Sequence, residues 1–120
     1  MTSPGWFAAV GCAVLLGVLD VVIWAVVSAA GGAGRSRSAG IRLPSLMASE
    51  EAWRAGHAAA RKVMGPLLVA AAVIAVLSVP LQLSPIAYVV TLGLSLACTV
   101  LALGAGAAAA SRVARQRADD

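Results

Sequence analysis

The chemistry that this sequence can support starts at Asp20, the only acidic or basic residue well inside an apolar segment. A carboxylate near the centre of a bilayer costs about 2.5–3.5 kcal/mol, so an aspartate there must face protein or water, or take up a proton. Such a residue can carry protons or bind a cationic substrate. It can also hold helices together and do nothing more. The sequence leaves both interpretations open.

The position of Asp20 along its helix suggests a partner. Helical spacing places it on a stripe of small and polar residues that we expect to face other helices: Ala9, Ala13, Gly17, Asp20, Trp24 and Ser28. At about 1.5 Å per residue, Asp20 lies roughly 21 Å below Trp6. Thr99 reaches nearly the same depth when the last apolar segment is counted from Ile86. We therefore expect an Asp20–Thr99 hydrogen bond, with the carboxyl protonated or reached by water.

A second group of polar and aromatic residues lies between the first two apolar segments: Gly40, Arg42, Ser49, Glu51, Trp53 and His57. Ser49 is a suitable N-cap, and Glu51 in the first turn complements the helix dipole. A helix over about residues 49–62 would carry His57 on a polar face, opposite a nearly smooth face of small residues. We expect this helix to lie at the membrane interface, and a solvated helix is the alternative.

The side chains of this group have simple expected roles. Arg42 suits a lipid phosphate, an ion pair with Glu51 or a partner contact. Trp53 suits the headgroup layer of a membrane. His57 suits a structural hydrogen bond, with a pH-sensing or ligand-binding role as the alternative.

Three apolar segments must position these residues, at about 6–30, 64–83 and 86–110. Hydrophobic residues make up 61% of the 120-residue chain and charged residues 12%, against about 25% charged in a soluble domain. Gly65-Pro66 predicts a kink or break before the second span, and the tail from Arg112 is expected to fray. The predicted fold is an all-α, single-domain integral membrane protein. It has three transmembrane helices and one cytoplasmic interfacial amphipathic helix in the loop 31–63.

The basic residues predict the orientation in the membrane. All nine Lys and Arg residues lie in two places, six between Arg35 and Lys62 and three between Arg112 and Arg117. Basic residues near span ends resist translocation. We therefore expect a bacterial inner-membrane protein with its N-terminus outside and its C-terminus in the cytoplasm. Because these charges flank spans, we expect them to meet anionic lipid headgroups and not nucleic acid.

The sequence shows no arrangement typical of an enzyme. It lacks a serine with a nearby base, paired carboxylates in a pocket and a phosphate-cradling glycine loop. Cys12 and Cys98 are isolated and the chain has one histidine, so no metal-ligand cluster is apparent. We expect no catalytic residue, no cofactor and no metal site.

Residues 40–57 resemble the signature of the SdpI family, bacterial membrane proteins similar to the immunity protein against a secreted sporulation-delay toxin. The family pattern is Gly-(aromatic or aliphatic)-Arg-Thr, then Ser-(acid)-Glu-x-Trp, then Asn or His. This sequence keeps the six residues Gly40, Arg42, Ser49, Glu51, Trp53 and His57, and has Leu43 at the usual threonine. The resemblance implies resistance to a membrane-active peptide, or retention of a cytoplasmic regulator at the motif loop.

We therefore expect a non-enzymatic membrane protein that acts by binding a toxic peptide or a cytoplasmic regulator. One alternative is a small proton-coupled transporter that uses Asp20. Another is a structural subunit of a larger membrane complex, for which the small residues around Gly17 and in Gly104–Ala110 are suited. A homo-oligomer also remains open.

Overall fold

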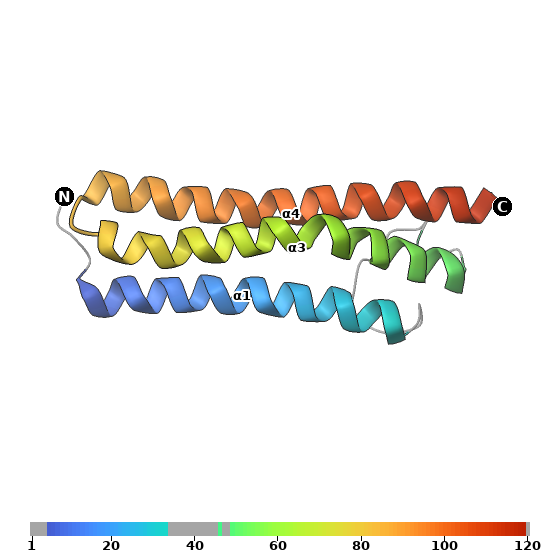
Figure 1. Cartoon of the computed structure of the whole chain (residues 1–120), viewed down its shortest axis with the longest axis horizontal. Helices are drawn as coiled ribbons and strands as arrows, with labels where there is room; N and C mark the ends of the chain where they lie inside the picture. Colours follow the sequence, from blue (N-terminus) through green and yellow to red (C-terminus); the bar gives the residue numbers. More distant parts are fainter. Residues whose placement is uncertain (1–4, 34–45, 47–48, 120) are drawn as a thin grey trace.

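The computed structural model describes residues 5–33, 46 and 49–119, which form three long helices. They are α1 (Trp6–Ala33), α3 (Glu50–Leu81) and α4 (Pro85–Asp119). Helix α3 lies between the other two and packs along both, whereas α1 and α4 scarcely touch (Figure 1). The resulting bundle measures 56 × 20 × 18 Å. The predicted all-α fold is confirmed.

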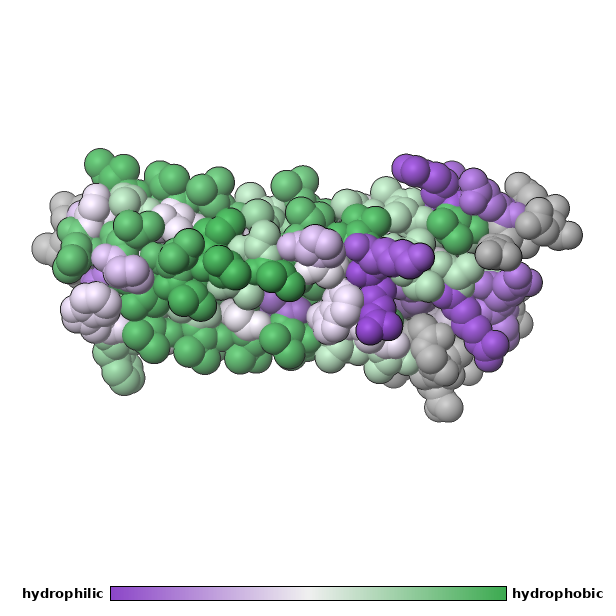
Figure 2. All heavy atoms as spheres, viewed as in Figure 1, coloured by the Kyte–Doolittle hydropathy of each residue, from purple (hydrophilic) through white to green (hydrophobic). Residues whose placement is uncertain are grey.

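All three helices are long and apolar enough to cross a membrane. This confirms the three predicted membrane spans by length and composition. Hydrophobic residues cover the molecule from the end where α1 begins to beyond its middle, and hydrophilic residues gather toward the end where α4 finishes (Figure 2).

Local hydrogen bonds fix where α3 begins and how it turns into α4. Ser49 is the N-cap of α3, and its hydroxyl oxygen accepts the backbone N–H of Ala52 at 3.0 Å. The turn after α3 contains Ser84, whose backbone N–H donates to the Leu81 carbonyl at 3.1 Å. Pro85 is the first residue of α4, where its missing N–H costs no hydrogen bond. The expected N-cap is confirmed.

The predicted break at Gly65-Pro66 is wrong. Helix α3 runs without interruption from Glu50 to Leu81, with Pro66 and Pro80 inside it. Residues 50–62 are therefore the first part of α3 and not a separate helix. Pro66 is exposed, whereas Met64 and Leu68 on either side of it are buried. Continuous packing of the buried face outweighs the one helical hydrogen bond that proline cannot make.

The expected fraying of the tail from Arg112 is also wrong, because α4 continues to Asp119. Ala110 and Ala114 are fully buried in the same cluster as Leu46 and Trp53. Packing therefore extends along α4 as far as Ala114, which the polar sequence of the tail did not indicate.

Small residues set the close approach of α3 and α4. The buried positions of α4 toward its C-terminal end recur every fourth residue at Ala102, Gly106, Ala110 and Ala114. A Cβ atom on Gly106 would overlap the side chain of Met64. Small interfacial residues of this kind let transmembrane helices pack backbone to backbone.

Candidate functional site

Asp20 occupies the middle of α1 and is almost completely buried, with 3% of its surface exposed. The Thr99 hydroxyl of α4 lies 2.7 Å from Asp20 Oδ1, so the expected hydrogen bond is present. This contact joins the two helices that otherwise scarcely meet. Counting residues by depth therefore brought the correct pair together.

The surroundings of the carboxyl group are sparse in polar atoms. The Thr99 hydroxyl also lies 3.2 Å from the Ser95 carbonyl oxygen one turn earlier in α4. Asp20 Oδ2 is buried and has no hydrogen-bond partner among the described residues. Leaving an ionised carboxylate oxygen unpaired in such a place is costly.

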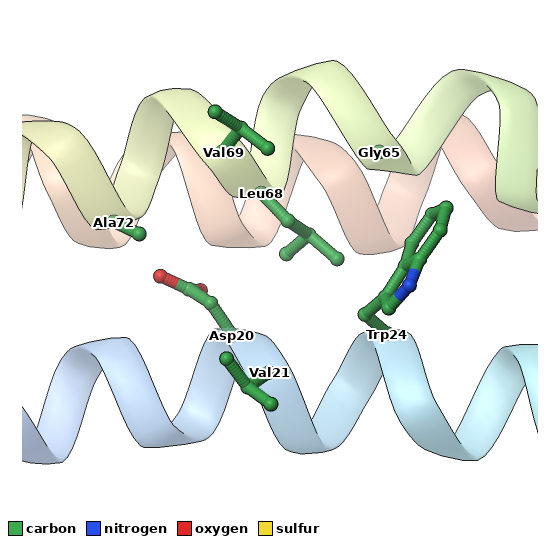
Figure 3. A pocket seen from close by; sticks show the side chains of 7 residues that line it. All are labelled: Asp20, Val21, Trp24, Gly65, Leu68, Val69 and Ala72. Carbon is green, nitrogen blue, oxygen red and sulfur yellow. The ribbon is translucent and has the colours of Figure 1, made fainter.

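A cavity of about 380 Å³ lies beside Asp20, between α1 and α3. Apart from the carboxyl group of Asp20, its walls are almost entirely apolar. The other lining residues are Val21, Trp24, Gly65, Leu68, Val69 and Ala72. Figure 3 shows the Asp20 side chain leaving α1 toward α3, with Ala72 and Leu68 opposite it and Trp24 one turn along. We name this space the Asp20 cavity.

The ring of Trp24 lines one end of the Asp20 cavity, and the guanidinium group of Arg61 lies over this ring. Trp24 packs so closely on α3 that a Cβ atom at Gly65 would lie 3.1 Å from its ring. The guanidinium carbon of Arg61 lies 5.1 Å from the ring centroid of Trp24, a cation–π geometry. Glycine at position 65 thus makes room for the tryptophan that lines the cavity.

A second group of interactions joins the end of α1 to the start of α3. Trp53 is fully buried, and its indole N–H donates to the Ala30 carbonyl of α1 at 2.6 Å. A buried indole of this kind needs such a partner. The expected headgroup position of Trp53 is therefore wrong, because the ring lies inside the bundle.

His57 lies beneath Trp53 and shares its buried face. Its Nδ1 is 2.9 Å from the Trp53 carbonyl oxygen, and the two ring centroids are 4.2 Å apart. A carbonyl can only accept, so Nδ1 carries the hydrogen of this bond. The expected polar face with His57 among the charged residues is wrong, since His57 is 1% exposed while Arg54 and Arg61 are exposed.

Gly56 is the point where three parts of the chain meet. A Cβ atom there would lie 2.8 Å from Leu46 Cδ2 and 3.1 Å from the carbonyl oxygen of Ala110 in α4. Leu46, Trp53 and Ala110 are all fully buried around it. We name this set, Leu46, Trp53, Gly56, His57 and Ala110, the motif junction.

The remaining motif residues divide between surface and undescribed positions. Glu51 is exposed in the first turn of α3, next to exposed Glu50. Gly40 and Arg42 lie outside the described residues. The structure brings Trp53 and His57 together on the buried face of α3. The sequence placed Gly56 only among the small residues of the smooth face, and it did not identify Leu46 or Ser95 as part of either site. Their signal was spacing, since Gly56 lies between Trp53 and His57, and Ser95 lies one turn before Thr99.

No group of three His, Cys, Asp or Glu side chains that could hold a metal ion occurs within the described part of the chain. The chemistry of the Asp20 cavity is therefore that of a single carboxyl group with one hydroxyl partner in apolar surroundings.

The family model described as the SdpI/YfhL protein family matches residues 33–109, more than half of the chain. The chain belongs to the SdpI family. Searches of curated proteins and of solved structures found no match. The matched region begins at the last residue of α1 and holds Thr99 and every residue of the motif junction except Ala110. Asp20 lies outside it.

Proposed function

We propose that this SdpI-family protein is a non-enzymatic immunity protein of the bacterial inner membrane, which binds a membrane-active peptide within the bilayer. The observation that carries the proposal is an apolar groove between α1 and α3. The Asp20 cavity is one part of it. A second cavity of about 540 Å³ shares Val21 and Ala72 with the first.

The second cavity extends the groove toward the start of α1. Its lining is wholly apolar: Val10, Ala13, Val14, Gly17, Val18, Val21, Ala72, Val76 and Val79. We name the two cavities together the α1–α3 groove. Helix α1 packs on one side of α3 and leaves α4 almost untouched, so the groove follows from the arrangement of the helices.

Such a groove suits a peptide that has inserted into a membrane. In lipid, helices associate through van der Waals packing, small residues and occasional polar contacts, because lipid is as apolar as they are. Gly17 and Ala72 in the groove leave room for a neighbouring backbone. A bound peptide would be held away from its target by these contacts, which is immunity by sequestration.

The motif junction supports a second surface on the cytoplasmic side. Trp53 and His57 are buried there, so they shape the start of α3 and are not the contact residues themselves. Exposed Glu50, Glu51 and Arg54 are residues that a cytoplasmic regulator would meet. Arg42 of the preceding loop suits the regulator or an anionic headgroup. This arrangement requires the predicted topology, with the basic loop and the C-terminus in the cytoplasm.

Survival of a deletion strain challenged with secreted peptides from the native organism and its neighbours tests the proposal. Wild type is expected to restore survival, and Ala72→Leu to fail, because a leucine at position 72 fills both halves of the groove. Ala97→Leu is the matched control, since Ala97 is exposed on α4 and lines neither half.

Membrane levels of each variant must match the wild type for the comparison to count. Equal protection by Ala72→Leu and wild type would rule out sequestration in the groove. In that case, loss of protection in Arg42→Ala alone would assign the activity to the cytoplasmic loop.

Asp20 favours a second candidate, a small proton-coupled transporter. A carboxyl group buried in a span, beside a cavity, is the feature such a mechanism requires. Proton-dependent export of a toxic compound that disappears in Asp20→Asn would favour this reading. A structural role in a larger membrane complex would instead show as stoichiometric co-purification with a large partner in mild detergent.

A further inference from the structure

We propose that Asp20 is protonated at rest and that the Asp20 cavity takes an apolar ligand carrying a cationic group, which replaces the proton on Asp20. The inference deepens the proposed function and rests on it only in placing the ligand in the α1–α3 groove. It names the chemical class of the ligand and the group that it displaces.

Counting hydrogens at Thr99 supports a protonated Asp20. The Thr99 hydroxyl has one hydrogen but lies within hydrogen-bond distance of two acceptors, Asp20 Oδ1 at 2.7 Å and the Ser95 carbonyl at 3.2 Å. If Asp20 is ionised, Thr99 has only its own hydrogen for both Oδ1 and the Ser95 carbonyl. If Asp20 is protonated, its O–H donates to Thr99, and Thr99 donates onward to Ser95. In the ionised form one hydrogen is shared between two acceptors, whereas the protonated form gives each contact a hydrogen of its own.

The second carboxyl oxygen of Asp20, Oδ2, also supports a protonated side chain. Oδ2 is buried and unpartnered among the described residues. A neutral carboxyl group leaves it as a carbonyl-type oxygen, whereas an ionised group leaves it carrying part of a negative charge in apolar surroundings. The second arrangement is far more costly.

The cavity next to Asp20 is built for an apolar cation. Its volume of about 380 Å³ lies within the range of ligand pockets, about 300–1,000 Å³. Valine, leucine and alanine side chains and the ring of Trp24 can hold the apolar part of a ligand. Asp20 supplies the only carboxyl group among the lining residues. Because Oδ2 is buried, the carboxyl group has to rotate into the cavity to meet the cation.

The exchange is a proton transfer that balances without any redox partner. The O–H bond of Asp20 breaks, the proton passes to bulk water, and the carboxylate is left facing the cation. The other charged or titratable groups nearby are Arg61, over Trp24 at the end of the cavity, and Cys98, next to Thr99 in α4. The charge of Arg61 repels a cation at that end, so the ligand cation is expected beside Asp20.

Calorimetry on the full chain in phosphatidylcholine nanodiscs tests the exchange. Octyltrimethylammonium is the probe because its charge does not change with pH. Octanol and octyl sulfate are the neutral and anionic controls, and protein-free nanodiscs give the background. We expect the cation alone to bind at Asp20, with affinity falling as the pH is lowered. Titrations in buffers of different ionisation enthalpy are expected to show up to one proton released per cation bound.

Variants separate this mechanism from nonspecific partitioning. Asp20→Asn is expected to weaken binding of the cation at least about tenfold and to abolish proton release. Thr99→Val removes the hydroxyl that accepts from Asp20 and is expected to change the pH at which the proton leaves. Thr91→Val is its matched control, because the Thr91 hydroxyl bonds only the Ala87 carbonyl of its own helix.

An infrared measurement reads the resting state directly. The C=O stretch of a buried carboxylic acid is expected in wild type, absent in Asp20→Asn, and reduced when octyltrimethylammonium is added. Equal binding by wild type and Asp20→Asn would overturn the proposal, as would binding without proton release. Loss of cation binding with intact survival in Asp20→Asn would overturn the proposed immunity mechanism at this cavity while leaving the cation site standing. Intact cation binding with lost survival in Asp20→Asn would overturn the cation site, and the survival of Ala72→Leu would then decide on sequestration.

Discussion

At the scale of single residues, the tryptophan of the SdpI motif joins two helices inside the bundle. Trp53 has no exposed surface, and its N–H reaches the carbonyl of Ala30, near the end of α1. His57 then donates to the carbonyl of Trp53, and its ring packs against the indole at a tilt of 39°. The two side chains order the start of α3 and couple it to α1, while Glu51 of the motif remains at the surface.

Trp53→Phe tests this link between the two helices. The variant keeps an aromatic ring but leaves the Ala30 carbonyl without its donor, so it should lower the free energy of unfolding by about 1–3 kcal/mol. Trp6→Phe is the matched control and should have almost no effect, because Trp6 is 55% exposed at the start of α1. Unfolding in mixed micelles, followed by circular dichroism, measures both. Equal stability of the two variants would show that the indole bond contributes nothing.

At the scale of elements, α1 is joined to the other helices by polar contacts at three levels. The Gly5 N–H donates to Gln82 Oε1 at 3.0 Å at one end. Asp20 and Thr99 meet in the middle, and Trp53 reaches Ala30 toward the other end. Because lipid offers little hydrophobic drive for helix association, such contacts are needed where packing is thin, as it is along the groove. Helices α3 and α4, by contrast, are held by small-residue packing.

Gly56→Ala tests that packing. The added methyl group would meet the side chain of Leu46 and the carbonyl of Ala110, a backbone atom that cannot move without α4. We expect a loss of about 1–3 kcal/mol. Gly104→Ala is the control on α4, where no atom lies within 4 Å of the new Cβ, and it should be neutral or slightly stabilising. Both are measured by the same unfolding assay, and a neutral Gly56→Ala would contradict the close approach.

Sequence periodicity located the elements well but not their rotation. The fixed rise of a helix predicted that Asp20 and Thr99 share a depth, and the structure joins them. The sequence also indicated the smooth face with Ala52 and Gly56. It did not show that the neighbouring edge of α3, with His57, is buried in the core together with that face. A helical wheel shows which residues share a face, and only the position of a neighbouring helix decides how far burial extends. His57 was therefore assigned to the polar face although α3 buries it.

The predicted break at Gly65-Pro66 was wrong for a related reason. Pro66 removes one hydrogen bond, a local cost that the sequence shows. The packing of Ala60, Met64 and Leu68 on the buried side is a tertiary gain that the sequence does not show. A continuous α3 is the result.

At the scale of the whole molecule, charge is distributed along the long axis of the bundle. The described charged residues of α3 lie in its first thirteen positions, from Glu50 to Lys62, and those of α4 lie beyond Ser111. Helix α3 starts and α4 finishes at the same end of the molecule (Figure 1). One end is therefore polar, and the described residues at the opposite end, with the Ser84-Pro85 turn, include no charged side chain. Only one orientation places the basic end in the cytoplasm.

Thiol labelling tests this orientation. In a background with Cys12→Ser and Cys98→Ser, a membrane-impermeant maleimide should label Ser3→Cys in intact cells and Gln116→Cys only after permeabilisation. The reason is that the uncharged end crosses the membrane readily, whereas three arginines follow the last span. Leu83→Arg with Ile86→Arg places two positive charges in the outer turn and should make part of the population accessible at Gln116→Cys. If Gln116→Cys is labelled in intact cells when residues 83 and 86 are unchanged, the topology is the reverse of the predicted one. The exposed motif residues would then face outward, where a cytoplasmic regulator could not reach them, and only binding within the bilayer would remain as a mechanism.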